Sequence, residues 1–403
     1  MNDTIGELLP PARLIMTPGP MSLDARVLRA LATPLVGHLD PYFISIMGDV
    51  QAMLRRAFQT ENRITFPVSG SGSAGIEASM VNPLEPGDEA IICVNGTFSE
   101  RMAMIAERTG TKVHRVEVPL GRAVDPEDVR RAGQGRKIKL VGLCHGETSS
   151  GVVTKLDGFR KVADELDALL VVDAVSTLGG VPLDVDGQRI DICFSGTQKA
   201  ISAPPGMAPI TVGPHAEEVL RNRRTPVQSW YFDLTATMNF WGKDRTYHHT
   251  PAISLVYALR EALRILFEEG LEGSWRRHQQ NQQAMISGLE ALGLEMFVAN
   301  PADRLPTVTA VRVPASVDDA RARRQLLEEF GIEIAGGIGA MKGKIWRVGL
   351  MGYVSQMKHV LLFLAGLEKV LLEQGFRASA GAGVGAALHA YAQLEMVGAT
   401  SHK

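Results

Sequence analysis

The chain has 403 residues and a formal net charge of −2, with 45% hydrophobic and 21% charged residues. This length and composition are typical of a globular protein of two or three domains, and they exclude a largely disordered chain. The near-neutral charge argues against nucleic acid or an anionic membrane surface as the main partner, and no apolar run approaches the ~20 residues of a membrane-spanning helix.

From about residue 60 to about residue 215, short apolar runs alternate with longer stretches whose apolar residues recur at helical spacing. The runs predict buried strands at 90–94, 139–144, 168–172 and 190–194. The longer stretches, together with one that precedes them, predict helices at 50–58, 98–109 and 156–167. Strands that alternate with helices form a mainly parallel sheet, so we predict an α/β fold.

The pattern changes after residue 251. Residues 252–295 predict a long helix, and the following residues predict a small α+β domain with strands at 307–313 and 344–348 and helices at 317–329 and 356–374. We therefore place a large domain at 21–260 and a small domain at 261–377. Residues 378–403 are rich in Ala and Gly, and we expect a poorly packed tail there, with a terminal helix as the alternative.

Asp173 ends one apolar run, and Lys199 follows the next one, 26 residues later. In open α/β sheets, ligands bind beyond the carboxyl ends of the strands. A carboxylate there either caps the following turn or pairs with a cationic ring nitrogen, the partner that pyridoxal phosphate needs to act as an electron sink. Small and apolar residues follow Lys199, and partial desolvation can leave a lysine amine neutral and nucleophilic. The pair therefore predicts a Schiff-base lysine opposite a pyridinium partner.

Two further segments carry small polar residues after apolar runs. Residues 68–78 are rich in Ser and Gly and precede a helical pattern, which favours phosphate binding by free backbone amides, with a plain turn as the alternative. In segment 145–151, we expect the hydroxyls to bind cofactor groups and Glu147 to brace a loop. His145 and Glu147 lack partners at ligand spacing, and the adjacent His248 and His249 cannot face the same way on a helix or strand, so we predict no metal site.

Arg347 lies inside an apolar run of the predicted small domain. Burying an unpaired guanidinium is costly, so we expect an anion beside it. That anion is either a structural carboxylate or a substrate carboxylate bound by two parallel hydrogen bonds, and the sequence leaves both open.

The three cysteines, Cys93, Cys144 and Cys193, are far apart in apolar runs, so we expect buried, reduced thiols. The first residues show no charged segment followed by an apolar run, which is the pattern of a secretory signal. We therefore expect a cytoplasmic protein.

Together, these segments resemble the class V aminotransferases of the pyridoxal-phosphate fold-type I superfamily, and among them the alanine/serine–glyoxylate aminotransferases. The resemblance covers roughly residues 13–375. It implies a large domain with a mainly parallel seven-stranded sheet flanked by helices, a smaller C-terminal α+β domain, pyridoxal phosphate as cofactor and a homodimer. The resemblance rests on residues 17–20, 69–78, 145–151, 173–180, 195–199 with 203–206, 247–250 and Arg347.

Carried over position by position, the resemblance implies that Lys199 forms the internal aldimine and then acts as general base and acid. Asp173 would pair with the pyridine nitrogen, Val175 would pack on the ring, and Ser149 would hydrogen-bond the ring oxygen. The phosphate would be surrounded by Ser71, Gly72, Ser73 and Gln198.

The same resemblance implies that Tyr247 and Thr250 reach the phosphate of the neighbouring subunit, so that the active site is shared in the dimer. Arg347 would bind the substrate carboxylate, and Gly19 lies in an N-terminal segment, 1–20, that would line the substrate pocket. The sequence departs from the family pattern at two positions. Phe98 stands where relatives often stack a Trp on the ring, a role that a phenyl ring can keep, and Ser73 stands where some relatives carry a His.

The resemblance implies a ping-pong transamination from alanine or serine to glyoxylate or pyruvate. The near relatives that transfer the amino group of ureidoglycine to glyoxylate carry amide side chains at two positions, and this chain has His38 and Tyr247 there. We therefore favour alanine or serine as donor, with ureidoglycine as the alternative. A non-catalytic protein of the same fold is a third alternative, against which the presence of Lys199, Asp173 and Arg347 argues.

Overall fold

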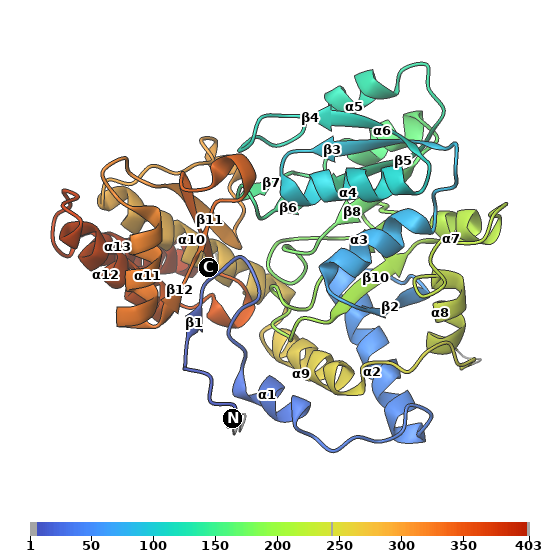
Figure 1. The fold of residues 1–403 in the computed structure, drawn as a ribbon, viewed down its shortest axis with the longest axis horizontal. Helices are drawn as coiled ribbons and strands as arrows, with labels where there is room; N and C mark the ends of the chain where they lie inside the picture. The colour runs from blue at the N-terminus through green and yellow to red at the C-terminus, as the bar shows by residue number, and fades with distance from the viewer. Residues whose placement is uncertain (1–5, 243–244, 401–403) are drawn as a thin grey trace, which may run out of the picture.

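A computed structural model describes residues 6–242 and 245–400. Its larger part is built on a seven-stranded sheet with the strand order β2-β10-β9-β8-β5-β3-β4 (Figure 1). β10 is antiparallel to both of its neighbours and the other neighbouring pairs are parallel, as the alternating pattern predicted. The strands are β2 (Ile64–Ser69), β3 (Glu89–Val94), β4 (Lys112–Glu117), β5 (Ile138–Cys144), β8 (Leu169–Asp173), β9 (Ile192–Phe194) and β10 (Met207–Val212).

Helices pack against this sheet, and the three predicted ones are confirmed. The helix expected at 50–58 begins earlier, because Asp40 caps it by accepting a hydrogen bond from the Tyr42 amide and Pro41 occupies its first turn. The helices of the larger part are α1 (Ala25–Leu31), α2 (Pro41–Phe58), α3 (Gly72–Val81), α4 (Thr97–Arg108), α5 (Pro126–Gly133), α6 (Phe159–Glu165), α7 (Pro214–Arg221) and α8 (Leu234–Trp241).

The long helix expected at 252–295 is two helices, so that prediction is wrong. α9 (Ile253–Glu269) ends and α10 (Leu271–Ala291) begins at Gly270. Gly270 adopts φ 82° and ψ 154°, a backbone conformation that interrupts the helical hydrogen bonds and that glycine reaches without steric cost. Apolar periodicity continues through the break, which is why the pattern alone did not reveal it.

A second hydrophobic core lies in the C-terminal part, around Trp346. Its sheet has the order β11-β14-β13, and the two-residue strand β1 (Leu14–Ile15) runs parallel to β12 (Ile332–Glu333), which ties the N-terminal segment to this part. The remaining elements are β6 (Gly146–Glu147), β7 (Val152–Val153), β11 (Val308–Arg312), α11 (Asp319–Phe330), β13 (Ala335–Gly336), β14 (Ile345–Gly349), α12 (Met357–Glu373) and the short 3₁₀ turns η1 (Pro301–Asp303), η2 (Gly339–Met341) and η3 (Gly352–Val354).

The expectation of a poorly packed tail at 378–403 is wrong for its described part, and the alternative, a terminal helix, is what forms. Helix α13 (Ala382–Thr400) packs on α10 and α12, at the red end of the chain in Figure 1. Ala387 and Tyr391 belong to the second core. A Cβ at Gly288 of α10 would lie 2.8 Å from the Gly383 carbonyl oxygen, so small residues let these two backbones approach closely.

Within the described chain, no helix combines the length and the apolar character that crossing a bilayer requires.

Candidate active site

A cavity of about 220 Å³ lies at the carboxyl ends of β5 and β8, beside the loop that follows β9. It brings together side chains from the N-terminal segment, the first turns of α3 and α4, and the loops after these strands. This is where ligands bind in open α/β sheets. The lining residues are Gly19, Gly72, Ser73, Ile76, Phe98, Arg101, Cys144, Gly146, Thr148, Asp173, Val175, Ser176, Gln198 and Lys199.

Lys199 is buried at this cavity, five residues after the end of β9. Its Nζ donates a hydrogen bond to the Pro18 carbonyl, and the backbone of Gly19 lies against its side chain. Burial lowers the pKa of Lys199 to about 8, although the negative charge of Asp173 opposes this shift. About a tenth of this amine is therefore neutral at pH 7, far more than of an ordinary lysine, and the neutral amine is the form that attacks a carbonyl.

Asp173 is buried at the end of β8, and its Oδ1 accepts a hydrogen bond of 2.8 Å from the Val175 amide. Burial raises the pKa of this carboxyl to about 7, the Val175 hydrogen bond opposes the shift, and the charge of Glu147 adds to it. A carboxyl whose ionised form is this poorly solvated is stabilised by a cation placed beside it. A protonated ring nitrogen is such a cation, so the surroundings of Asp173 fit a bound pyridoxal phosphate.

We expect the reactivity of Lys199 in the cofactor-free protein to rise with pH around a midpoint near 8, because burial lowers its pKa from 10.5 to about 8. The sign follows from the charge: only the neutral amine reacts, and its fraction grows as pH rises through the folded-state pKa. Competitive acetylation followed by peptide mass spectrometry measures the midpoint, and the exposed Lys161 is the internal control. Equal midpoints for the two lysines would contradict the shift.

The Ser/Gly loop between β2 and α3 has features that favour an anion. Ser71 precedes α3 and makes no capping hydrogen bond through its side chain, so the first amides of the helix are not satisfied by it. A Cβ at Gly72 would lie 2.9 Å from Cγ2 of Val175, so glycine is required for the loop to approach Val175 this closely. Gln198 Oε1 is buried at the same cavity without a hydrogen-bond partner among the described residues. The free amides fit a phosphate group, and Gln198 can add a hydrogen bond to it only through its Nε2 donor, because an amide oxygen accepts and does not bind an anion.

Glu147 organises the turn that carries Phe98, as the sequence predicted. Its Oε2 accepts hydrogen bonds from the amides of Phe98 (3.0 Å) and Ser99 (3.1 Å). Its Oε1 accepts from the amide and the hydroxyl of Ser149, at 3.0 and 2.6 Å. Ser149 Oγ in turn accepts from the Thr97 amide at 2.9 Å. The Ser149 hydroxyl hydrogen therefore points to Glu147, and Ser149 is not among the lining residues of the cavity.

Arg347 is buried in β14, directly behind Thr148 of the cavity wall. Its Nε donates to the Gly336 carbonyl (2.8 Å) and its Nη1 to the Thr148 carbonyl (3.1 Å). Burial lowers the pKa of Arg347 to about 10, and the charge of Glu147 opposes the shift. These partners are backbone carbonyls, and within the described residues no carboxylate forms an ion pair with this guanidinium. Of the two anions that the sequence left open, a structural carboxylate is therefore not the partner of Arg347 in this structure.

Three predicted site residues lie together on the surface, away from this chain's own cavity. The rings of His38 and Tyr247 are 5.2 Å apart, and the Tyr247 and Thr250 hydroxyls are 3.2 Å apart. Tyr247 is 55% exposed. The structure thus groups these residues with one another but not with Lys199.

The neighbouring His248 and His249 approach each other, with their Nδ1 atoms 2.7 Å apart. The two side chains do not diverge as they would on a helix or strand, because residues 247–250 form neither. His145 is buried, which lowers its pKa to about 4, and its Nδ1 lies 3.0 Å from the Thr177 hydroxyl. No cluster of three or more His, Cys, Asp or Glu side chains suited to a metal ion occurs in the part of the chain that the structure describes.

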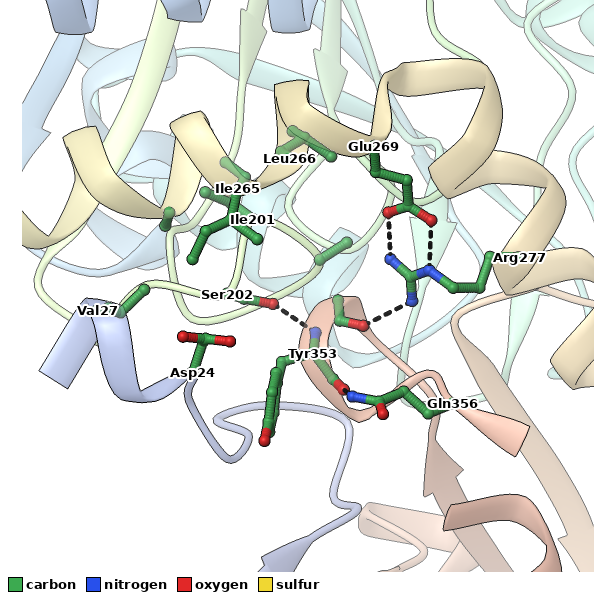
Figure 2. A pocket seen from close by; sticks show the side chains of 13 residues that line it. Asp24, Val27, Ile201, Ser202, Ile265, Leu266, Glu269, Arg277, Tyr353 and Gln356 are labelled. Atoms are coloured by element: carbon green, nitrogen blue, oxygen red, sulfur yellow. Dashed lines mark hydrogen bonds and ion pairs between the residues drawn. The ribbon is translucent and has the colours of Figure 1, made fainter. Parts of the chain in front are cut away.

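The segment that follows Lys199, residues 200–202, also lines a second cavity of about 280 Å³. Figure 2 shows Ser202 joined to the backbone of Tyr353, and Arg277 directed at Glu269 and at the η3 turn. Arg277 uses Nε and Nη2 for Glu269 and Nη1 for the Gly352 and Ser355 carbonyls. Its donors are thus engaged in linking α9, α10 and η3, a framework that holds residues 200–202 in place.

Arg101 and Ser176 line the cavity but were not singled out from the sequence, whereas Thr148 belongs to segment 145–151, whose hydroxyls were expected at the cofactor. Arg101 had a usable signal, because it follows Phe98 by three positions in a predicted helix and so shares its face. Ser176 had none beyond its place after a strand.

Comparison with known proteins identifies the family. Residues 27–356 match the model of the class V aminotransferases. The (S)-ureidoglycine–glyoxylate transaminase of Bacillus subtilis is 42% identical, over 96% of this chain and 97% of its own. The alanine–glyoxylate aminotransferase of Callithrix jacchus is 41% identical, over 90% and 88%.

Solved structures agree with this result. The ureidoglycine–glyoxylate aminotransferase of Bacillus subtilis superposes with a TM-score of 0.93 at 44% identity, covering 96% of this chain and 100% of that one. The alanine–glyoxylate aminotransferase of a Nostoc species superposes with a TM-score of 0.89 at 41% identity, covering 92% and 99%. With Lys199, Asp173 and the Ser/Gly loop at one cavity, these matches establish that the chain belongs to the class V aminotransferases, enzymes that use pyridoxal phosphate.

Proposed function

We propose that this enzyme moves the amino group of alanine or serine to glyoxylate, with pyruvate as a second acceptor. The observation that carries the proposal is the Arg347 guanidinium, buried beside the cavity with backbone carbonyls as partners and one nitrogen, Nη2, without a partner among the described residues. Such a group binds a carboxylate, which small amino acids and 2-oxo acids share. Both kinds of relative named above act on glyoxylate, which supports glyoxylate as acceptor.

The cofactor, when bound, supplies an electron sink for the carbanion formed at the substrate α-carbon. We assign its phosphate to the loop of Ser71, Gly72 and Ser73 with Gln198, and its ring to the space between Val175 and Phe98. Asp173 holds the proton of the ring nitrogen in place. Lys199 would hold the cofactor through its Nζ. Once released by the amino donor, the same nitrogen would move the proton from the donor α-carbon to the cofactor carbon to which it had been attached. Ser149 and Glu147 keep Phe98 in position from behind.

Replacing Arg347 with alanine is expected to raise KM for alanine and for glyoxylate by about 10- to 100-fold, the usual effect of losing a charge-assisted hydrogen bond. We expect kcat to fall less, because the proton transfer at Lys199 does not use Arg347. Steady-state kinetics with both substrates measures the effect, and replacement of the exposed Arg321 by alanine is the matched control. Wild-type KM values in the Arg347 variant would sink this assignment.

The second candidate is transfer from (S)-ureidoglycine to glyoxylate, which the near-complete match to the Bacillus subtilis enzyme favours. Against it stand His38 and Tyr247, which occupy the two positions where we expect amides in ureidoglycine enzymes. An imidazole and a phenol have no amide to pair with a ureido group.

Half-reactions decide between the donors. Stopped-flow mixing of the holoenzyme with alanine, serine or ureidoglycine follows the loss of the visible cofactor absorbance. We expect fast loss with alanine or serine and slow loss with ureidoglycine. A ureidoglycine rate that exceeds both others would transfer the assignment to the second candidate.

We also propose a homodimer in which Tyr247 and Thr250 complete the phosphate site of the neighbouring subunit. The exposed positions of Tyr247 and Thr250 support this arrangement. So do large apolar side chains exposed around His38, whose ring centre lies 5.2 Å from that of Tyr247: Leu35 is 63%, Leu39 57% and Tyr42 65% exposed. Mixing Lys199→Ala subunits with Tyr247→Phe/Thr250→Ala subunits then creates one intact site in each mixed dimer. We expect about one quarter of wild-type activity at limiting cofactor, and no gain if the site is confined to one subunit.

We further propose the division into a large domain, 21–260, and a small domain, 261–377, and a cytoplasmic location. Two separate cores support a division into two domains, although the first core extends to Leu266 of α9 and the second includes Ala387 and Tyr391 of α13. The three buried free thiols support a cytoplasmic location, since reducing compartments keep thiols unpaired. Limited proteolysis of the apoprotein and fractionation of the source cells test them.

A further inference from the structure

Arg101 is a cation at the cavity for which the reaction described above has no role. It lies on α4, three residues after Phe98, and both side chains line the cavity. Its Nη1 donates a hydrogen bond of 2.8 Å to Ser73 Oγ. Its guanidinium carbon is 5.2 Å from the centre of the Phe98 ring, and Lys199 Nζ is 5.9 Å from the same centre. Within the described residues, no carboxylate forms an ion pair with Arg101.

A phosphate dianion at the Ser/Gly loop needs positive charge nearby, and the chain's own supply is small. Among the lining residues, only Arg101 and Lys199 carry cationic groups. Lys199 is committed to the reacting carbon of the cofactor, at the other end from its phosphate. The backbone amides of α3 provide partial charge only. Arg101 thus brings a full positive charge to the Ser/Gly loop, because it is hydrogen-bonded to Ser73 in the first turn of α3.

We propose that Arg101 is a cofactor-binding residue that neutralises the phosphate of pyridoxal phosphate and orients the Ser73 hydroxyl towards it. With Arg101 donating to Ser73 Oγ, the Ser73 hydroxyl hydrogen is free to be donated to a phosphate oxygen. The guanidinium also keeps donors of its own for the phosphate, since one of its nitrogens is used by Ser73. Arg101 also contacts Phe98, the side chain that we assign to the cofactor ring, so one residue contacts both the phosphate site and the ring site.

The competing role for Arg101 is the binding of a distal substrate carboxylate. The structure favours the phosphate for two reasons. Arg101 is bonded to the loop at the start of α3, and the guanidinium assigned to the substrate, Arg347, comes from β14 on another wall. The inference rests on the phosphate assignment in the proposed function, and not on the choice of amino donor.

The test compares two ligands that differ by the phosphate alone. Equilibrium binding of pyridoxal phosphate and of pyridoxal to the apoprotein is measured by absorbance for wild type, Arg101→Met, Arg101→Lys and Gln198→Ala. Arg108→Met is the matched control, because Arg108 lies on the same helix but is exposed. We expect Arg101→Met to lose about 10- to 100-fold in affinity for pyridoxal phosphate while its affinity for pyridoxal stays within about threefold of wild type. Arg101→Lys should recover part of the loss.

The affinity for pyridoxal phosphate divided by the affinity for pyridoxal is the ratio that separates the alternatives. If Arg101 only supports Phe98 and the fold, both ligands lose affinity equally and the ratio keeps its wild-type value, which overturns the proposal. If the ratio is unchanged and KM for dicarboxylic substrates rises, Arg101 binds the substrate, and the proposal is overturned as well. If Gln198→Ala lowers the ratio and Arg101→Met does not, the phosphate assignment stands and the role of Arg101 fails. If neither lowers it, the phosphate assignment of the proposed function fails as well.

Discussion

Replacing Lys199 with alanine is expected to remove the visible absorbance of the bound cofactor and to lower kcat by about 10⁴-fold or more, since both the covalent attachment and the proton transfer are lost. The structure supports so large an effect because Lys199 is the buried amine of the cavity, with its pKa lowered to about 8. Absorption spectroscopy and turnover of alanine with glyoxylate measure the two losses.

Two controls make the Lys199 result specific. Lys161→Ala removes an exposed lysine and should leave both readouts at wild-type values. Small primary amines such as methylamine should restore part of the turnover of Lys199→Ala, because they can enter the space left by the side chain and move the proton. A Lys199→Ala protein that keeps its absorbance and turnover would refute the assignment of this residue.

Replacing Asp173 with asparagine is the second large effect that we expect, with kcat lower by about 10³-fold, the size typical of losing an electrostatic group aimed at the reacting charge. Burial raises the pKa of Asp173 to about 7, so its ionised form depends on a cation beside it. An amide of the same shape cannot keep the ring nitrogen protonated. Steady-state kinetics at saturating cofactor measures the loss, and Asp157→Asn on the exposed surface is the control.

A cofactor analogue with a methyl group on the ring nitrogen tests the reason for the Asp173 effect. Its ring is permanently positive, so it no longer needs Asp173 to keep a proton. We expect this analogue to raise the activity of Asp173→Asn well above that with pyridoxal phosphate. Equal activities with the two cofactors would show that Asp173 acts through the fold and not through charge.

The positions of Lys199 and Asp173 could be predicted from sequence because both depend on local rules. Each follows a short apolar run, such runs form the buried strands of a parallel sheet, and ligands bind where those strands end. The same rule placed four strands of the sheet, at β3, β5, β8 and β9. The bracing role of Glu147 could also be predicted, because a buried acid in a loop of small residues accepts hydrogen bonds from the backbone amides around it.

Other features depended on contacts that a pattern does not contain. The break at Gly270 reflects one backbone conformation inside a continuous apolar pattern. Helix α13 forms although its residues suggested a loose tail, because small side chains such as Gly383 fit closely against Gly288 of α10. Arg101 contacts Ser73 because α3 and α4 pack together. Helical spacing predicts its place beside Phe98, but it does not predict this contact.

By itself, the sequence determined the α/β class, the lysine, its carboxylate partner and the glycine-rich loop, since periodicity and strand-end chemistry are local properties. The tertiary structure decided what surrounds them. It placed Pro18 and Gly19 against Lys199, and it left Arg347 with backbone carbonyls in place of a carboxylate. It also left Tyr247 exposed and outside the lining of its own chain's cavity. These are contacts between residues far apart in the chain, and the packing of the whole fold sets them.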